Sequence, residues 1–181
     1  MKFPLNSKLT GLLATFAMLP AALAADDSFS LLCYTTTGLF GAAELYYKNG
    51  FIMISNATSP SNMTSIYFTR DQGSPSAPWR VSSNTTKSPN PHFSSGALAL
   101  PVYDSPGSAN AGVAVTNSST GSAADLLLYG ETVFARVNGS YQNPFYAATT
   151  NDVDVWQLLW NPVDPGNKDL TPVVLRTSNV L

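Results

Sequence analysis

One stretch decides the fold class of this chain: Leu45-Tyr46-Tyr47-Lys48-Asn49-Gly50-Phe51-Ile52-Met53-Ile54. Two apolar runs flank Asn49-Gly50, a dipeptide that tolerates the positive φ values of a tight hairpin turn. The pattern therefore predicts two antiparallel strands joined by this turn. Asn138-Gly139 offers a second tight turn of the same kind.

Similar short runs recur along the chain, bounded by Gly, Pro, Asn, Asp and Ser, without a convincing helical period. We expect an all-β chain, a single-domain β-sandwich or barrel of about ten short antiparallel strands. Two polar stretches, 71–95 and 104–124, are interpreted as long loops within that domain. Besides the alternating run at Phe29/Leu31/Cys33, further strands are predicted at Ser65–Arg70, Trp79–Ser82, Ala97–Tyr103, Val113–Asn117, Leu126–Tyr129, Thr132–Asn138, Phe145–Thr149, Val153–Trp160 and Val173–Thr177.

The first 24 residues have the composition of a secretory signal peptide. Lys2 and Lys8 precede an apolar run that ends in Ala22-Leu23-Ala24, a small-x-small cleavage pattern. The run is shorter than the roughly 20 residues that a membrane-spanning helix needs, so we expect no membrane anchor. Residues 25–181 then form the secreted domain, with seven basic and eleven acidic side chains and a net charge of −4. Without a basic stripe, nucleic-acid binding is not expected.

A single histidine and a single cysteine limit the chemistry of the chain. A His₂ or Cys₂ metal site, a zinc cluster or a disulfide framework needs several such ligands, so we expect no metal and no cofactor. Cys33 lies on the Phe29/Leu31/Cys33 face of an alternating run. We interpret it as a buried small hydrophobe in a monomer, and a disulfide-linked dimer is the alternative.

Asn-x-Ser/Thr sequons are frequent in the predicted secreted domain. In a secreted protein each is an acceptor for an N-glycan, and a glycan must face solvent. Chance in an Asn-, Ser- and Thr-rich chain is the alternative origin, but the number and the loop positions favour use of most of them. The predicted glycosylation sites are Asn56, Asn62, Asn84, Asn117 and Asn138.

Catalytic constellations are hard to find, and no catalytic residue is predicted. His92 lies in a proline-rich polar stretch without a Gly-x-Ser-x-Gly elbow anywhere in the chain, so it is interpreted as an exposed loop histidine. Glycoside hydrolysis needs two carboxylates on either side of the scissile bond. The candidates are Glu44, Glu131, Asp125, Asp152 and Asp154, of which Asp152 and Asp154 alternate along one strand or, more simply, form a turn.

Aromatic residues suggest a second kind of site. Trp156 and Trp160 share one face of the last long strand, and Trp79 borders a polar loop. Core packing is the simpler interpretation for Trp156 and Trp160, whereas Trp79 is the better candidate for an exposed ring. The functional alternative is that Trp79, Trp156 and Trp160 form a platform on which sugar rings stack.

Three segments share the pattern of one group of proteins. They are Ser28-Phe29-Ser30-Leu31-Leu32-Cys33-Tyr34 with the hairpin 45–54, Phe145-Tyr146-Ala147-Ala148 with Val155-Trp156-Gln157-Leu158-Leu159-Trp160-Asn161, and Thr171-Pro172-Val173-Val174-Leu175-Arg176-Thr177. In these segments the chain resembles small secreted β-rich glycoproteins of filamentous fungi, which are distantly similar to fungal cell-wall and IgE-binding secreted proteins. The resemblance implies an extracellular or wall-associated β-protein and does not imply a reaction.

The sequence thus predicts a non-enzymatic secreted fungal glycoprotein, associated with the cell wall or extracellular, that acts at a host or substrate surface. The first alternative is a glycan-binding module that uses exposed aromatic residues. The second is a carboxylate-dependent enzyme acting on glycans. Partners expected under these hypotheses are cell-wall or host polysaccharide, or host proteins.

Overall fold

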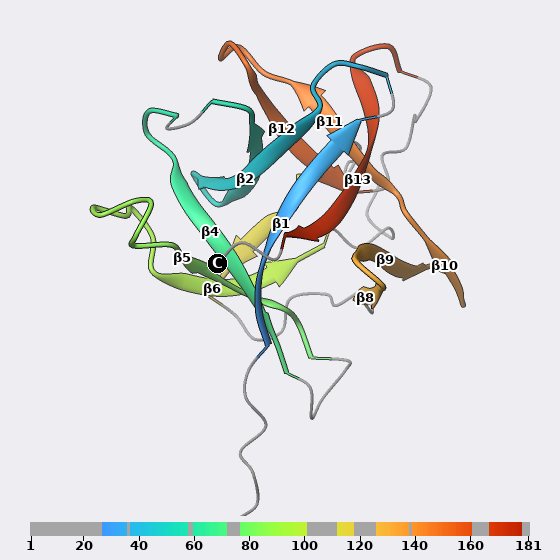
Figure 1. Cartoon of the computed structure of the whole chain (residues 1–181), viewed down its shortest axis with the longest axis horizontal. Helices are drawn as coiled ribbons and strands as arrows, with labels where there is room; N and C mark the ends of the chain where they lie inside the picture. The colour runs from blue at the N-terminus through green and yellow to red at the C-terminus, as the bar shows by residue number, and fades with distance from the viewer. Residues whose placement is uncertain are drawn as a thin grey trace, which may run out of the picture.

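The computed structural model describes residues 27–35, 37–57, 60–71, 77–100, 112–117, 126–137, 139–160 and 167–178. In this part of the chain thirteen β-strands form one sheet with antiparallel pairings (Figure 1). None of the described residues belongs to a helix long and apolar enough to cross a membrane. The all-β prediction is confirmed, and the predicted signal peptide, residues 1–24, lies outside the described residues.

Every strand predicted from the sequence overlaps an observed strand, and one short strand, β10, is an addition. β10 follows the predicted tight turn, where Gly139 has a φ of 81°. The strands are β1 (Asp27–Thr35), β2 (Ala42–Lys48), β3 (Phe51–Ser55), β4 (Thr64–Arg70), β5 (Arg80–Ser83), β6 (Ser95–Ala99), β7 (Ala114–Thr116), β8 (Leu126–Tyr129), β9 (Thr132–Val137), β10 (Ser140–Gln142), β11 (Phe145–Thr149), β12 (Val155–Trp160) and β13 (Leu170–Ser178).

The strands of the sheet form two large rings, and a direct β1–β4 pairing at Asp27–Phe29 closes a third, smaller ring of β1, β2 and β4. The first ring runs from β1 through β2, β3, β12, β11 and β13 back to β1. The second runs from β2 through β4, β5, β6 and β7 to β3, which pairs with β2. β8 and β10 flank β9, which joins the first ring at β13. Because the sheet closes on itself, a barrel describes it better than a sandwich, the other predicted architecture.

The β2–β3 hairpin belongs to both rings. Its turn is the predicted one, because Asn49 and Gly50 have φ values of 52° and 90° and Lys48 pairs with Phe51. The outer edge of β2 is shared by two strands. β1 pairs with its first residues, at Ala42–Glu44, and β4 pairs with its last ones, at Tyr46 and Tyr47. β1 and β4 thus pair with the same edge of β2 at different positions along it.

A single large hydrophobic cluster joins the two rings. Inward-facing residues of β2 and β3, such as Leu45 and Ile52, pack with residues of both rings, such as Phe68 of β4 and Leu175 of β13. Cys33 is a fully buried member of this cluster with a free thiol. Its predicted burial as a small hydrophobe is confirmed.

Candidate functional site

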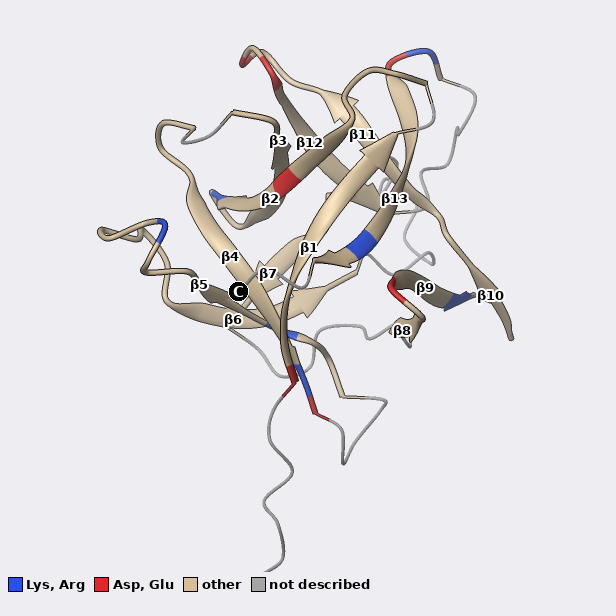
Figure 2. Ribbon diagram, viewed as in Figure 1, with Lys and Arg blue, Asp and Glu red and all other residues tan. Residues whose placement is uncertain are grey.

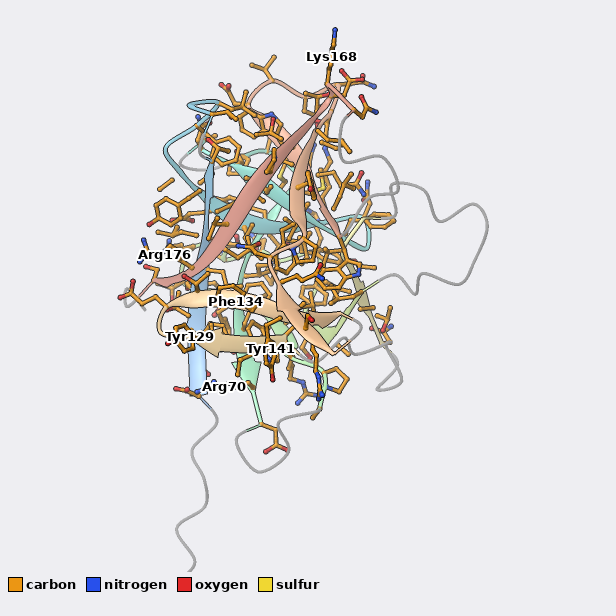
Figure 3. All side chains as sticks on the ribbon, turned by 90° about the vertical axis from the view of Figure 1, so that its right-hand side faces the viewer. Arg70, Tyr129, Phe134, Tyr141, Lys168 and Arg176 are labelled. Atoms are coloured by element: carbon orange, nitrogen blue, oxygen red, sulfur yellow. The ribbon has the colours of Figure 1, made fainter. Side chains whose placement is uncertain are left out.

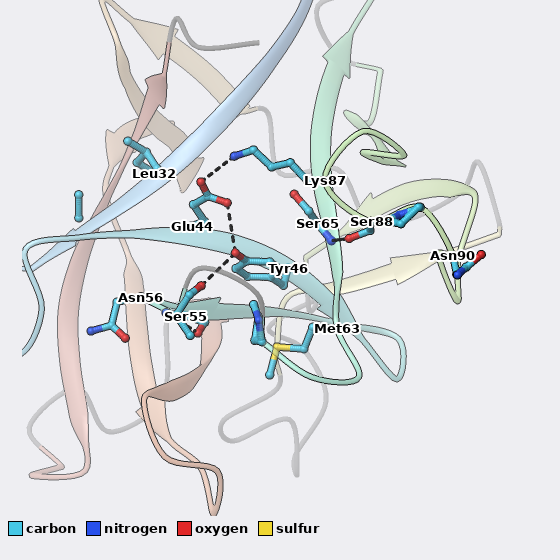
Figure 4. A pocket seen from close by; sticks show the side chains of 14 residues that line it. Leu32, Glu44, Tyr46, Ser55, Asn56, Met63, Ser65, Lys87, Ser88 and Asn90 are labelled. Carbon is cyan, nitrogen blue, oxygen red and sulfur yellow. Dashed lines mark hydrogen bonds and ion pairs between the residues drawn. The ribbon is translucent and has the colours of Figure 1, made fainter.

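A pocket of about 750 Å³ lies over the outward face of β2 (Figure 4). Side chains alternate along a strand, so Ala43 and Leu45 enter the core while Glu44 and Tyr46 face outward. Two loops close over this face: the β3–β4 loop, which contributes Asn56 and Met63, and the β5–β6 loop, which contributes Lys87, Ser88 and Asn90. The volume falls within the range of about 300–1,000 Å³ that is usual for small-molecule sites.

Tyr46 forms the floor of the pocket. Although it faces outward from β2, it is only 4% exposed, because Met53, Val155 and Met63 pack against it. Its hydroxyl group lies 3.2 Å from Oε2 of Glu44 and 3.3 Å from the carbonyl oxygen of Ala57, two acceptors for its one proton. Burial raises the pKa of the Tyr46 phenol, and the negative charge and hydrogen bond of Glu44 raise it further. Tyr46 is therefore a fixed, neutral hydrogen-bonding group.

Glu44 and Lys87 carry the charges of the pocket lining. Nζ of Lys87 lies 2.7 Å from Oε1 of Glu44, an ion pair between β2 and the β5–β6 loop. The loop is shaped by Asn84, whose side-chain oxygen accepts hydrogen bonds from the backbone N–H groups of Thr86 and Lys87 at 3.2 and 3.3 Å. Both charged side chains remain partly exposed toward the pocket. The lining residues thus have no net charge.

Hydroxyl and amide groups supply the other polar contacts. Ser55 is fully buried and its Oγ accepts a hydrogen bond from the backbone N–H of Ala57 at 3.1 Å. Oγ of Ser88 accepts from the backbone N–H of Ser65 at 2.9 Å, which ties the β5–β6 loop to β4. Figure 4 shows the Ser65 side chain directed into the same space as Glu44 and Lys87.

The predicted tryptophan platform is not formed. Trp79, Trp156 and Trp160 are only 4%, 7% and 5% exposed, and all three belong to the large hydrophobic cluster. Trp79 meets the ring of Phe29 edge-on at a centroid distance of 5.1 Å. The prediction that Trp79 is exposed is wrong, because β1 and β4 place aromatic residues around it; the core interpretation of Trp156 and Trp160 is confirmed.

The candidate acids do not converge on one site. Glu44 pairs with Lys87 in the pocket, Asp152 pairs with Lys48, and Glu131 pairs with Arg176. Asp154 is exposed in the β11–β12 turn with a φ of 57°, and Asp125 lies outside the described residues. Figure 2 shows the acidic positions at several different places on the ribbon. Of the described candidates, only Glu44 lines the pocket.

His92 is exposed, as expected for a loop histidine. Its backbone N–H donates a hydrogen bond to Oγ1 of Thr64 at 3.2 Å. The residue follows the pocket-lining Pro89 and Asn90 but is not itself among the residues that line the pocket.

Three of the predicted glycosylation sites lie on the two loops that contribute to the pocket. Asn56 lines it, Asn62 precedes the lining residue Met63, and Asn84 shapes the turn that carries Lys87. Asn56 and Asn62 are exposed and Asn84 is half-buried. Of the other two predicted sites, Asn117 is exposed after β7, and Asn138 lies outside the described residues.

Exposed aromatic side chains gather elsewhere, on the outer face of β8, β9 and β10. In the antiparallel register Leu127 lies opposite Phe134, Tyr129 opposite Thr132, and Tyr141 opposite Arg136, so these side chains share one face. Tyr129 is 77% exposed and Tyr141 is 55% exposed, and both lie near Phe134 in Figure 3. The rings of Tyr129 and Phe134 meet edge to face, with centroids 6.5 Å apart.

Comparisons with protein-family models, with curated proteins and with solved structures found no match to this chain. The assignment of function therefore depends on the geometry. Sequence reasoning singled out Glu44 and Asn56 but missed Tyr46, Ser65 and Lys87. The grouping of three sequons within 56–84 was the available signal, because it marks the two loops that form the pocket.

Proposed function

We propose that this chain is a secreted, non-enzymatic glycoprotein that binds a neutral saccharide in the pocket over β2. The predicted signal peptide and sequons, and the resemblance to small secreted fungal glycoproteins, support an extracellular or cell-wall location. The binding role comes from the pocket. In this proposal the ligand is a short oligosaccharide of a cell wall or a host surface.

The observation that carries the proposal is the balanced chemistry of the pocket lining. Glu44 and Lys87 compensate each other, so the lining favours an uncharged ligand over an anion or a cation. Serine hydroxyls and the amides of Asn56 and Asn90 both donate and accept hydrogen bonds. Sugar hydroxyl groups do the same, and the apolar face of a sugar ring can lie against Met63.

We propose binding without catalysis because the pocket supplies one carboxylate. Glycoside hydrolysis uses one carboxyl group as an acid and a second as a nucleophile or base. Among the residues that line this pocket Glu44 is the only acid, and it is held by Lys87 and Tyr46. This arrangement fits a group that orients a ligand.

Calorimetric titration of the unglycosylated full chain with neutral, acidic and amino sugars tests the proposal. We expect a neutral oligosaccharide to bind with a dissociation constant of about 1 mM or lower, and acidic and basic analogues at least about tenfold more weakly. Glu44→Gln removes the charge that orients the ligand and should weaken binding about tenfold. Asp152→Asn, which removes a carboxylate outside the pocket, is the matched control and should leave binding unchanged. Absence of heat with every neutral saccharide at about ten times that concentration would contradict the proposal.

The aromatic face of β8, β9 and β10 favours a second candidate function, retention on insoluble polysaccharide. Tyr129 and Tyr141 present ring surface to solvent, which the buried tryptophans cannot do. Aromatic rings contribute dispersion contacts to the apolar faces of sugars. Exposed aromatic residues would still bind the polysaccharide, as predicted, but the residues would be Tyr129 and Tyr141 instead of the three tryptophans.

Retention on insoluble glucan and chitin tests this second candidate. The double substitution Tyr129→Ala with Tyr141→Ala should reduce the retained fraction several-fold, since both rings are largely exposed and their loss should leave folding intact. Val153→Ala, at a residue 87% exposed in the β11–β12 turn, is the control for loss of exposed apolar surface. Equal retention of the double variant and the parent protein would show that the face of β8, β9 and β10 does not bind the polysaccharide.

A further inference from the structure

Asn56 holds a fixed position at the edge of the pocket. It directly follows Ser55, the last residue of β3, and it is exposed and lines the pocket. The next residue, Ala57, is held at both its backbone groups: its N–H donates to Oγ of Ser55, and its carbonyl oxygen accepts from the Tyr46 hydroxyl. The backbone around Asn56 is therefore anchored to the floor of the pocket.

The other two sequons around the pocket are placed differently. The side-chain oxygen of Asn84 caps the turn that carries Lys87, and the residue is half-buried. Asn62 lies on an exposed turn with a φ of 60°. Of these three asparagines, Asn56 is the one that lines the pocket.

We propose that an N-glycan attached to Asn56 is an intramolecular ligand of the pocket, with its first sugars lying over Glu44, Tyr46 and Lys87. Attachment joins the side-chain nitrogen of Asn56 to C1 of the first sugar of a lipid-linked oligosaccharide, while an amide proton and the lipid pyrophosphate leave. This inference rests on the proposed function, because the same saccharide chemistry suits the tethered glycan and a free ligand.

Tethering gives the glycan an advantage over free saccharides. A ligand on a short flexible tether has an effective concentration in the millimolar range. If the tethered sugars bind with a dissociation constant of about 1 mM at an effective concentration of about 10 mM, the pocket is free about one tenth of the time. The apparent dissociation constant of a free saccharide then rises about tenfold. The glycan thus regulates access to the site.

Two variants, each secreted from a glycosylating eukaryotic host, distinguish the effect of the glycan from the effect of the Asn56 side chain. Thr58→Ala destroys the sequon and keeps the Asn56 side chain at the edge of the pocket. Ser119→Ala removes the sequon of Asn117, an exposed residue that does not line the pocket.

Mass spectrometry measures the occupancy of Asn56. Acylation with an amine-specific reagent then measures the accessibility of Lys87, with the exposed Lys168 as internal reference.

We expect an occupied Asn56 and a Lys87 that reacts several-fold faster in Thr58→Ala than in the parent protein, while Ser119→Ala behaves like the parent. The affinity of Thr58→Ala for a neutral oligosaccharide should be about tenfold higher than that of the glycosylated parent. An unmodified Asn56, or equal Lys87 reactivity in the parent and Thr58→Ala, overturns the inference. Failure of Thr58→Ala to bind any saccharide instead contradicts the proposed function, so the two failures are distinguishable.

Discussion

At the scale of single residues, two buried ionisable groups, the Cys33 thiol and the Tyr46 phenol, make the stability of the fold depend on pH. Burial raises the pKa of the Cys33 thiol, and burial together with Glu44 raises the pKa of the Tyr46 phenol. In the unfolded chain these groups ionise near their ordinary pKa values, about 8.5 for a thiol and about 10 for a phenol. The native state keeps both protons beyond those pH values. Each group therefore adds stability that is fully present below its ordinary pKa and is lost as pH rises above it.

The free energy of unfolding should fall with pH above about 8.5, by at most about 1.4 kcal/mol per pH unit for each group. Between about pH 8.5 and 10 the slope should be due to Cys33, and Cys33→Ala should reduce it. Above about pH 10 Tyr46 adds to the slope, and Tyr46→Phe should remove that part. Urea unfolding at a series of pH values measures the slopes. The same slope in Tyr46→Phe and the parent protein would show that the phenol is not shielded as the structure places it.

Trp79 illustrates why the surroundings of an individual candidate residue were hard to predict. The sequence places it beside a polar loop, which suggests exposure. Its surroundings come from β1 and β4, where Phe29 and Phe68 lie about fifty and eleven positions away in the chain and meet it edge-on. Such contacts depend on which strands pair, and a local pattern cannot report that. Cys33 was predictable because its alternating run indicates an inward face.

At the scale of elements, the strands follow local signals and their order in the sheet does not. Apolar runs and the Asn49-Gly50 turn were enough to predict the β2–β3 hairpin. The short β10 was missed because Ser140–Gln142 lacks an apolar run. Pairings such as β1 with β13 join opposite ends of the described chain, and local sequence patterns do not indicate them. The sequence therefore predicted a sandwich or a barrel without distinguishing between the two.

Close approach of β6 and β7 gives an element-scale prediction. A Cβ atom on Gly96 would lie 2.7 Å from Cγ1 of Val115 and 2.8 Å from the carbonyl oxygen of Thr116. Because backbone cannot move aside cheaply, Gly96→Ala should destabilise the protein by about 1–3 kcal/mol. Gly41→Ala is the control, since no atom beyond its two chain neighbours lies within 4 Å of its Cβ position, and it should change stability by less than about 0.5 kcal/mol. Thermal unfolding of the two variants provides the comparison, and equal midpoints would contradict the β6–β7 register.

At the scale of the whole molecule, the pocket is made of segments that the sequence separates. β2 provides the floor, the β3–β4 and β5–β6 loops provide walls, and β1 and β4 add the lining residues Leu32 and Ser65. The sequence marked these loops with sequons, but it could not place Lys87 against Glu44. The proposed saccharide site and the proposed Asn56 glycan both depend on this assembly.

The most direct test of the saccharide site is to fill it. Ala42 is an exposed pocket residue at the start of β2, so Ala42→Trp should occupy the mouth of the pocket without disturbing the core. Val153→Trp places the same side chain on the exposed β11–β12 turn as a control. The measurement is the affinity of the two unglycosylated variants for the neutral oligosaccharide that the parent binds best. We predict that Ala42→Trp loses binding by at least about a hundredfold while Val153→Trp retains parental affinity. Equal affinity of the two variants would contradict a ligand site over β2.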